Sequence, residues 1–273
     1  MNDVVWRGAS PVLTADLAGR TWRLTLDDPR PGLSWSDAGD QARILTLDHV
    51  AGSDRRDPSA FTRSSLVSWG RHGTRLEATF APPAWPGLNV RAAWSPTADR
   101  AGFDLEVQVG MTSTAVLRQL EIAVRSVWWQ ETDSPPDTWA YHVEPRDARS
   151  AALSYDGREP AELLQSLTTR PVPSASPHPF APRLFPVASP PPGSVYAEMV
   201  QPDDCARRII GEPRDAGAQG SSWTGYGLFG HDLEKGVILR GRIRGCWIES
   251  SRPDQEAARR YESFLNEPPP LGP

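Results

Sequence analysis

Hydrophobic and polar side chains alternate with a period of two along much of this chain, as in strands that bury one face and expose the other. The alternation is clearest between residues 73 and 129. Four successive stripes run through Leu76–Phe80, Leu88–Trp94, Phe103–Val109 and Leu117–Trp129. Because short turns separate them, we predict long strands in an antiparallel meander with one buried and one wet face.

A second pattern surrounds the turn at Gly236. Two strand-like runs, Tyr226–His231 and Val237–Glu249, flank this turn, and glycine there favours a hairpin. Within the second run, one face carries the basic residues Arg240, Arg242 and Arg244. The opposite face carries an apolar stripe of Leu239, Ile243 and Trp247 and ends in Glu249.

The end of the chain has a helical pattern instead. Ser251 and Asp254 have the spacing of a capping box, and apolar side chains recur afterwards at helical intervals. We predict one short C-terminal helix over residues 251–266, followed by a tail over 267–273. The Pro-rich stretch 170–193 is predicted to be an ordered loop wrapped over the sheet.

The fold class follows from these patterns. We predict an all-β protein, a large antiparallel β-sandwich of supersandwich type with one helix, forming a single domain over residues 1–273. Its 28 Pro and 22 Gly fit many short strands joined by turns.

Composition and motifs exclude several classes of function. A net charge of -5 argues against a general nucleic-acid binder. The sequence lacks an apolar stretch of membrane-spanning length and a signal-peptide pattern, so we expect a cytoplasmic protein without membrane association. Cys205 and Cys246 have no further ligands at metal-site spacing, and their state as free or bridged stays open. No nucleotide, dinucleotide or α/β-hydrolase motif occurs, and we expect no metal and no cofactor.

The arginine ladder is the first candidate site. Arg240, Arg242 and Arg244 stand about 7 Å apart along one strand face. Guanidinium groups bind carboxylates in a bidentate manner, so this face could hold an acidic sugar or another anion. Alternatively, the three arginines pair with carboxylates on neighbouring strands, such as Asp104 and Glu106.

A second candidate lies in the segment Tyr141–Asp147. His142 and Glu144 share one face of a strand there, as an acid–base pair or as a structural hydrogen-bonding pair. Trp139 and Tyr141 could stack on a sugar ring or pack in the core. His231, at the hairpin entrance, is a further binding candidate, whereas the pattern assigns His49 no partner.

The succession of strand stripes resembles the galactose mutarotase-like supersandwich family. The segment Trp247-Ile248-Glu249-Ser250-Ser251-Arg252-Pro253-Asp254 adds a strand-end Glu ahead of Pro-Asp, similar to the segment that carries the catalytic base of mutarotases. The resemblance implies Glu249 as the base and His142 as the acid that protonates the ring oxygen. The Asn-His motif of the family is absent around His142, where the chain reads Tyr-His-Val-Glu.

Two functions from different classes remain open. The first is a carbohydrate-binding or carbohydrate-modifying protein that uses a concave sheet face, with an epimerase-like or lyase-like reaction and a neutral or acidic sugar as its ligand. The second is a non-catalytic interaction or scaffold domain with a protein partner. The sequence leaves the oligomeric state undefined.

Overall fold

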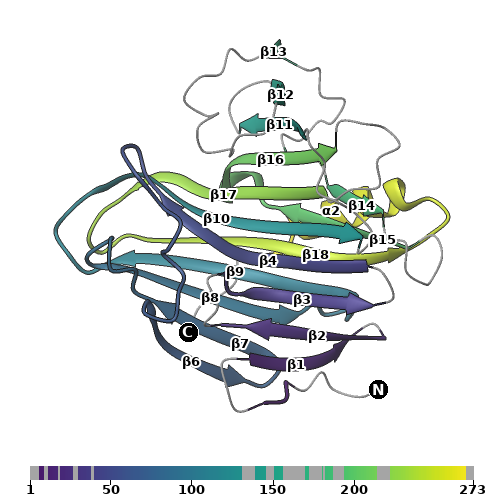
Figure 1. Ribbon diagram of the computed structural model, residues 1–273, viewed down its shortest axis with the longest axis horizontal. Coiled ribbons are helices and arrows are strands. Elements are labelled where there is room, and N and C mark those ends of the chain that lie inside the picture. The colour runs from purple at the N-terminus through teal and green to yellow at the C-terminus, as the bar shows by residue number, and fades with distance from the viewer. Residues whose placement is uncertain are drawn as a thin grey trace.

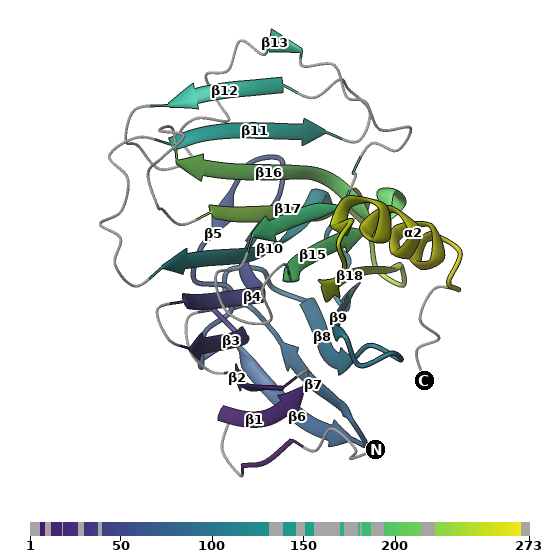
Figure 2. The same ribbon diagram turned by 90° about the vertical axis from the view of Figure 1, so that its right-hand side faces the viewer.

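A computed structural model of the chain shows two large antiparallel sheets packed face to face and, within the residues that it describes, one α-helix, which confirms the predicted all-β sandwich (Figures 1 and 2). The structure describes residues 6–8, 12–17, 19–26, 30–37, 40–130, 139–145, 151–155, 170–171, 180, 182–186, 194–213 and 222–268. Most of the predicted loop 170–193 and the tail from residue 269 lie outside these ranges.

The larger sheet has 11 strands in the order β1-β2-β3-β4-β10-β17-β16-β11-β12-β13, with β5 paired to β4. Its strands are β1 (Val12–Leu17), β2 (Arg20–Thr25), β3 (Gly32–Asp37), β4 (Asp40–Ala51), β5 (Arg56–Asp57), β10 (Leu117–Gln130), β11 (Trp139–Pro145), β12 (Ala151–Tyr155), β13 (Arg170–Pro171), β16 (Cys205–Pro213) and β17 (Ser222–Leu233). Strands β4, β10 and β17 are therefore neighbours near its middle.

The smaller sheet has seven strands in the order β14-β15-β18-β9-β8-β7-β6. Its strands are β6 (Leu66–His72), β7 (Arg75–Phe80), β8 (Leu88–Pro96), β9 (Gly102–Met111), β14 (Arg183–Pro186), β15 (Ser194–Val200) and β18 (Ile238–Glu249). A short 3₁₀ helix, η1 (Pro202–Asp204), precedes β16, and helix α2 (Pro253–Leu265) follows β18.

Two predicted strand pairings are wrong, although the strands themselves form. Of the four meander stripes, β7, β8 and β9 are neighbours, but β10 crosses to the larger sheet and pairs with β4 and β17. Likewise β17 and β18 do not form a hairpin, because the turn at Gly236 carries the chain from one sheet to the other. A period of two defines which face of a strand is buried, and it leaves the neighbour undefined.

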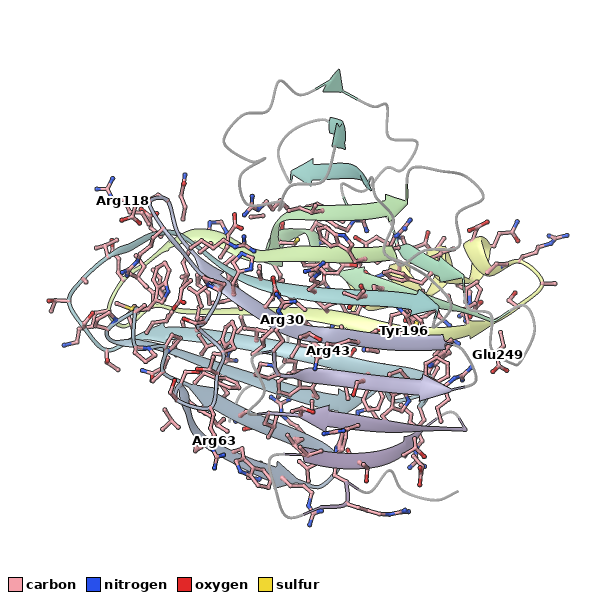
Figure 3. All side chains as sticks on the ribbon, in the orientation of Figure 1. Arg30, Arg43, Arg63, Arg118, Tyr196 and Glu249 are labelled. Carbon is pink, nitrogen blue, oxygen red and sulfur yellow. The ribbon has the colours of Figure 1, made fainter. Side chains whose placement is uncertain are left out.

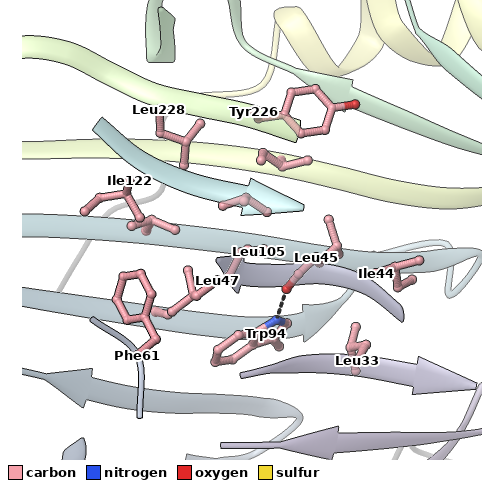
Figure 4. Packing of buried hydrophobic residues seen from close by; sticks show 14 of the residues in the cluster. Leu33, Ile44, Leu45, Leu47, Phe61, Trp94, Leu105, Ile122, Tyr226 and Leu228 are labelled. Carbon is pink, nitrogen blue, oxygen red and sulfur yellow. Dashed lines mark hydrogen bonds between the residues drawn. The ribbon is translucent and has the colours of Figure 1, made fainter. Parts of the chain in front are cut away.

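The core fills the space between the two sheets. Leu33, Ile44 and Leu47 of the larger sheet pack toward Trp94 and Leu105 of the smaller one, all fully buried (Figure 4). The indole N–H of Trp94 donates to the backbone carbonyl of Leu45 at 2.9 Å, and this bond joins the sheets across the core. The predicted apolar stripes thus meet each other across the interface.

Helix α2 covers part of the outer face of the smaller sheet, beside β15 and β18 (Figure 2). Ala257, Tyr261 and Phe264 pack there against Cys246 and Ile248. The predicted capping box does not form: Arg252 is the N-cap residue, without a side-chain cap, and Pro253 begins the helix. Proline is favoured at this first position because its missing N–H would have no partner there.

We expect Phe264→Ala to destabilise the fold by about 3–5 kcal/mol, because it leaves a cavity under α2. Phe264 is fully buried in the second apolar cluster. Urea denaturation measures the change in the free energy of unfolding. Glu262→Ala, on the exposed side of the same helix, is the matched control and should change little. Equal effects of both substitutions would contradict the docking of α2 through Phe264.

Candidate functional site

The face of the larger sheet that points away from the smaller sheet gathers charged side chains. Along β10, Ile122 and Val124 face the core, so the alternate residues Glu121 and Arg125 lie on the opposite, free face. Strands β4 and β16 bring further charged groups to this face. Figure 3 labels Arg30 and Arg43 over its central strands.

A β-bulge at Asp48 shapes the centre of this face. His49 lies opposite Ala123 of β10 and Leu47 lies opposite Val124, so Asp48 is the extra residue of the pair. A bulge lets two consecutive side chains approach the same side of a sheet. Asp48 and His49 are therefore neighbours on the free face instead of alternating.

A second irregularity lies earlier in β4, between Arg43 and Thr46. Arg43 pairs with Val127 and Thr46 with Arg125, so Ile44 and Leu45 together oppose Ser126. Leu45 has a φ of 49°, which is uncommon for a residue with a branched side chain. Irregular backbone of this kind in the middle of a sheet often accompanies functional sites.

Asp48 and His49 form a hydrogen-bonded pair at 3.0 Å between Oδ2 and Nδ1. Burial alone would raise the pKa of Asp48, but the hydrogen bond with His49 and the charge of Arg30 outweigh it, so this pKa lies below its ordinary value. Because the ionised carboxylate can only accept, Nδ1 of His49 carries the proton and donates it.

His49 is held in its neutral form. Burial lowers its pKa, and the positive charge of Arg56 lowers it further, while the hydrogen bond with Asp48 acts in the opposite direction; the net result is a pKa below 6.5. With the proton on Nδ1, the lone pair lies on Nε2. A histidine in this state accepts protons at neutral pH.

Guanidinium groups surround the pair. Nε of Arg30 lies 3.0 Å from Asp48 Oδ1, and Nη2 of Arg56 lies 3.9 Å from Asp48 Oδ2. Arg207 of β16 binds Glu121, with Nη2–Oε2 at 2.8 Å. Among the described residues, this face gathers Arg30, Arg56, Arg125 and Arg207 around Asp48 and Glu121. Its local charge is therefore positive in a protein whose net charge is -5.

An indole ring lies beside these groups. The guanidinium carbon of Arg125 is 4.5 Å from the centre of the Trp223 ring. Trp223 lies flat against Gly211, where an added Cβ would come within 2.1 Å of the indole nitrogen. Glycine at this position of β16 is therefore required for the ring to lie on the sheet, and Trp223 keeps 6% of its surface exposed.

The candidate site residues predicted from the sequence lie on three different strands, β11, β17 and β18. Trp139, Tyr141, His142 and Glu144 lie on β11, with His142 opposite Ile210 and Glu144 opposite Arg208 in register. The side chains of β11 lie outside the described residues. Their assignment as binding or catalytic groups stays a prediction.

His231 lies near the end of β17, where it is exposed and opposite Leu120 of β10. Glu249 is exposed at the end of β18 in the smaller sheet, opposite Ser194, and Figure 3 labels it there. The structure thus places Glu249 and His142 in different sheets.

The arginine ladder lies on the outer face of the smaller sheet, largely under α2. Arg244 holds Asp104 with two bonds of 2.7 and 2.8 Å and also binds Glu267. Arg242 also pairs with Glu267, at 3.0 Å, and both guanidiniums lie over the ring of Phe264. Arg240 donates to Gln108 at 3.1 Å. The alternative of pairing with neighbouring carboxylates therefore holds for Arg244 and Asp104, whereas Glu106 binds Arg75 instead.

The expectation that His49 has no partner is wrong. A signal for its pairing exists in the sequence Ile44-Leu45-Thr46-Leu47-Asp48-His49-Val50, where the alternation breaks twice. Two apolar residues adjoin at 44–45 and two polar residues adjoin at 48–49. Each pair of adjacent residues of the same kind marks a place where a bulge inserts one extra residue into β4.

A buried carboxyl group lies between the sheets. Glu198 of β15 is fully buried, close to Ser126, Tyr196 and Tyr226. Burial raises its pKa to about 7, and the hydroxyl groups of its neighbours moderate this effect. Within the described residues, no cluster of three or more His, Cys, Asp or Glu side chains could hold a metal ion.

Comparison with known proteins gives one weak resemblance. No protein-family model matches the sequence, and no curated protein sequence matches it. Among solved structures, the chain is similar to galactose mutarotase-like proteins of Clostridium acetobutylicum (7% identity, 91% of this chain and 99% of that chain, TM-score 0.46) and Lactobacillus casei (12%, 90% and 100%, 0.47). It is also similar to an aldose epimerase homologue from C. elegans (7%, 91% and 99%, 0.44).

This resemblance agrees with the one noted in the sequence, and its low identities leave function to the residues of the site. No helix within the described residues is long and apolar enough to span a bilayer.

We expect the pKa of His49 to lie below 6.5 and to respond in opposite directions to two substitutions. Asp48→Asn removes the carboxylate that raises this pKa, so the value should fall further. Arg56→Gln removes a neighbouring positive charge, so it should rise. NMR titration of the imidazole measures both, and shifts of the same sign would contradict the described pair.

The burial of Glu198 predicts pH-dependent stability. Its folded-state pKa of about 7 exceeds the ordinary 4.5, so the folded protein holds this proton more tightly than the unfolded chain. The stability of wild type relative to Glu198→Gln should therefore fall by roughly 3 kcal/mol as the pH rises from about 4.5 to about 7, and should then level off. Denaturant unfolding of both proteins at several pH values measures it, and a constant difference would contradict the burial of an ionisable carboxyl.

Proposed function

We propose that this protein binds an anionic carbohydrate on the free face of the larger sheet, around Asp48 and His49. The observation that carries the proposal is the neutral His49, fixed by Asp48 on a doubly bulged strand and surrounded by guanidinium groups. Guanidiniums bind a carboxylate or phosphate group through charge-assisted hydrogen bonds. Asp48 and Glu121 supply acceptors for hydroxyl groups on the same face.

The combination of cations and acceptors supports this class of ligand. A simple anion needs only the arginines, and a neutral sugar needs only hydrogen-bonding groups. A sugar acid or sugar phosphate uses both, because it presents a negative group and several hydroxyls within one ring. The protein as a whole is acidic, and this face is locally positive. The local positive charge steers anions toward this face.

The same site supports proton transfer. Nε2 of His49 can accept the proton of the anomeric hydroxyl while the C1–O1 bond becomes a carbonyl. The bond between C1 and the ring oxygen breaks in the same step, and the ring oxygen takes a proton from an acid or from water. Reclosure on the other face of the carbonyl then gives the other anomer. Asp48 orients His49 and stabilises the imidazolium that forms.

Water is the proton donor to the ring oxygen in this step. Strand β11, which carries the predicted acid His142, lies four strands from β4 in the larger sheet, about 19 Å at ordinary strand spacing. Because O1 and the ring oxygen are bonded to the same carbon, His142 is too far from His49 to act on the same ring, and its role stays a separate prediction. Glu249 stays a separate prediction at the end of β18.

Binding of D-glucuronate tests the proposal. Calorimetry should show binding to wild type that is weakened about tenfold or more by Arg56→Gln, because a charge-assisted hydrogen bond contributes about 1.5–3 kcal/mol. Arg240→Gln, on the outer face of the smaller sheet, is the matched control and should bind like wild type. Glucose, which lacks the anionic group, should bind more weakly.

The binding proposal fails if no sugar acid or sugar phosphate binds, or if Arg56→Gln and Arg240→Gln behave alike. Proton transfer is tested separately by polarimetry of D-galacturonate. Wild type should accelerate the interconversion of its anomers, and His49→Gln should abolish the acceleration while folding normally. Binding without acceleration would leave a binding protein and remove the catalytic step.

The alternative of an interaction domain has one observation in its favour. The edge strand β6 exposes Val67 (65%) and Trp69 (38%). An uncovered edge strand can pair with a strand of a partner. Loss of a partner upon Trp69→Lys, together with absence of sugar binding, would favour this function.

A further inference from the structure

Four neighbouring strands of the larger sheet place small residues between charged ones. In register, His49 of β4 lies opposite Ala123 of β10, and Ala123 lies opposite Gly227 of β17. Gly227 in turn lies opposite Arg207 of β16. At ordinary strand spacing, the backbones of His49 and Arg207 are about 14 Å apart, and the two residues between them carry only a methyl group and a hydrogen.

Glycine at position 227 lets the ion pair between Arg207 and Glu121 lie close to the backbone of the sheet. A Cβ added to Gly227 would come within 2.6 Å of Glu121 Oε2 and 3.2 Å of Arg207 Cγ. Nε and Nη2 of Arg207 bind that same oxygen of Glu121, at 2.9 and 2.8 Å. The pair therefore presents a hydrogen-bond donor and an acceptor side by side at the level of the sheet.

Ala123 lies in the middle of these polar groups. It is half-buried, so part of its methyl group is exposed on the free face. Along β10, Glu121 and Arg125 are the next residues on the same face, each about 7 Å away. His49 lies beside Ala123 on β4. An apolar surface surrounded by a few polar groups suits a sugar ring, whose C–H groups form an apolar face and whose hydroxyls point outward.

We propose that the ring of the sugar acid lies on Ala123, and that the small size of this residue determines which ligands bind. With the anomeric hydroxyl at His49, the hydroxyls on the opposite side of the ring reach Glu121 and Arg207. The carboxylate accepts from one hydroxyl, and the guanidinium donates to the next. The inference rests on the proposed function, since it locates the ring within the same site.

Binding of D-glucuronate to Ala123→Leu tests the inference. The leucine side chain occupies the place of the ring, so calorimetry should show binding weakened about tenfold or more. Ala123→Ser hardly changes the volume and should bind within about twofold of wild type. Urea denaturation checks that each variant folds. Ala123→Val, whose β-branched side chain suits a strand, repeats the test if leucine prevents folding.

Val127→Leu is the control, because it introduces the same side chain on the same face of β10. Val127 lies two residues beyond Arg125, opposite Arg43 and Trp223, and its variant should bind like wild type. Wild-type binding by folded Ala123→Leu or Ala123→Val overturns the inference, and so does an equal loss in Val127→Leu; the proposed function stands in both cases. If wild type binds no sugar acid, the proposed function and the inference fall together.

Discussion

The hydrogen bond between the Trp94 indole and the Leu45 carbonyl is the constraint on which the free face of the larger sheet depends. It ties β4 to the opposite sheet at Leu45, whose backbone is left-handed, and the backbone N–H of the same residue donates to Ser126. An ordinary strand here would alternate strictly and would turn either Asp48 or His49 into the core. The two bulges instead keep Leu47 inside and both polar groups outside.

Sequence patterns predict the buried faces of this protein well and the strand neighbours poorly. The stripes at Leu76–Phe80, Leu88–Trp94 and Phe103–Val109 become three adjacent strands, as expected. The stripe at Leu117–Trp129 is equally regular, yet it crosses to the other sheet. Both outcomes bury the same side chains, so burial alone cannot distinguish them. Pairing depends on long-range register that alternation does not encode.

The site was harder to predict than the fold, for a physical reason. Bulges place Asp48 beside His49, and a strict period of two separates adjacent residues onto opposite faces. The doubled pairs at 44–45 and 48–49 are the trace of these bulges in the sequence. The arginine ladder, by contrast, was visible because it obeys the period, and the structure gives Arg242 and Arg244 carboxylate partners beneath α2.

The two faces show how one residue type serves two purposes. On the smaller sheet, Arg244 forms ion pairs with Asp104 and Glu267, which balance its charge. Its guanidinium also lies over the ring of Phe264 and so contacts helix α2. On the larger sheet, guanidiniums outnumber carboxylates around a histidine. Burial, helped by the charge of Arg56, lowers the pKa of His49, while Asp48 fixes its tautomer with the lone pair on Nε2. Under the proposed function, the cationic groups therefore act in two ways: they attract the anion, and they add to burial in keeping an imidazole that can take a proton from it.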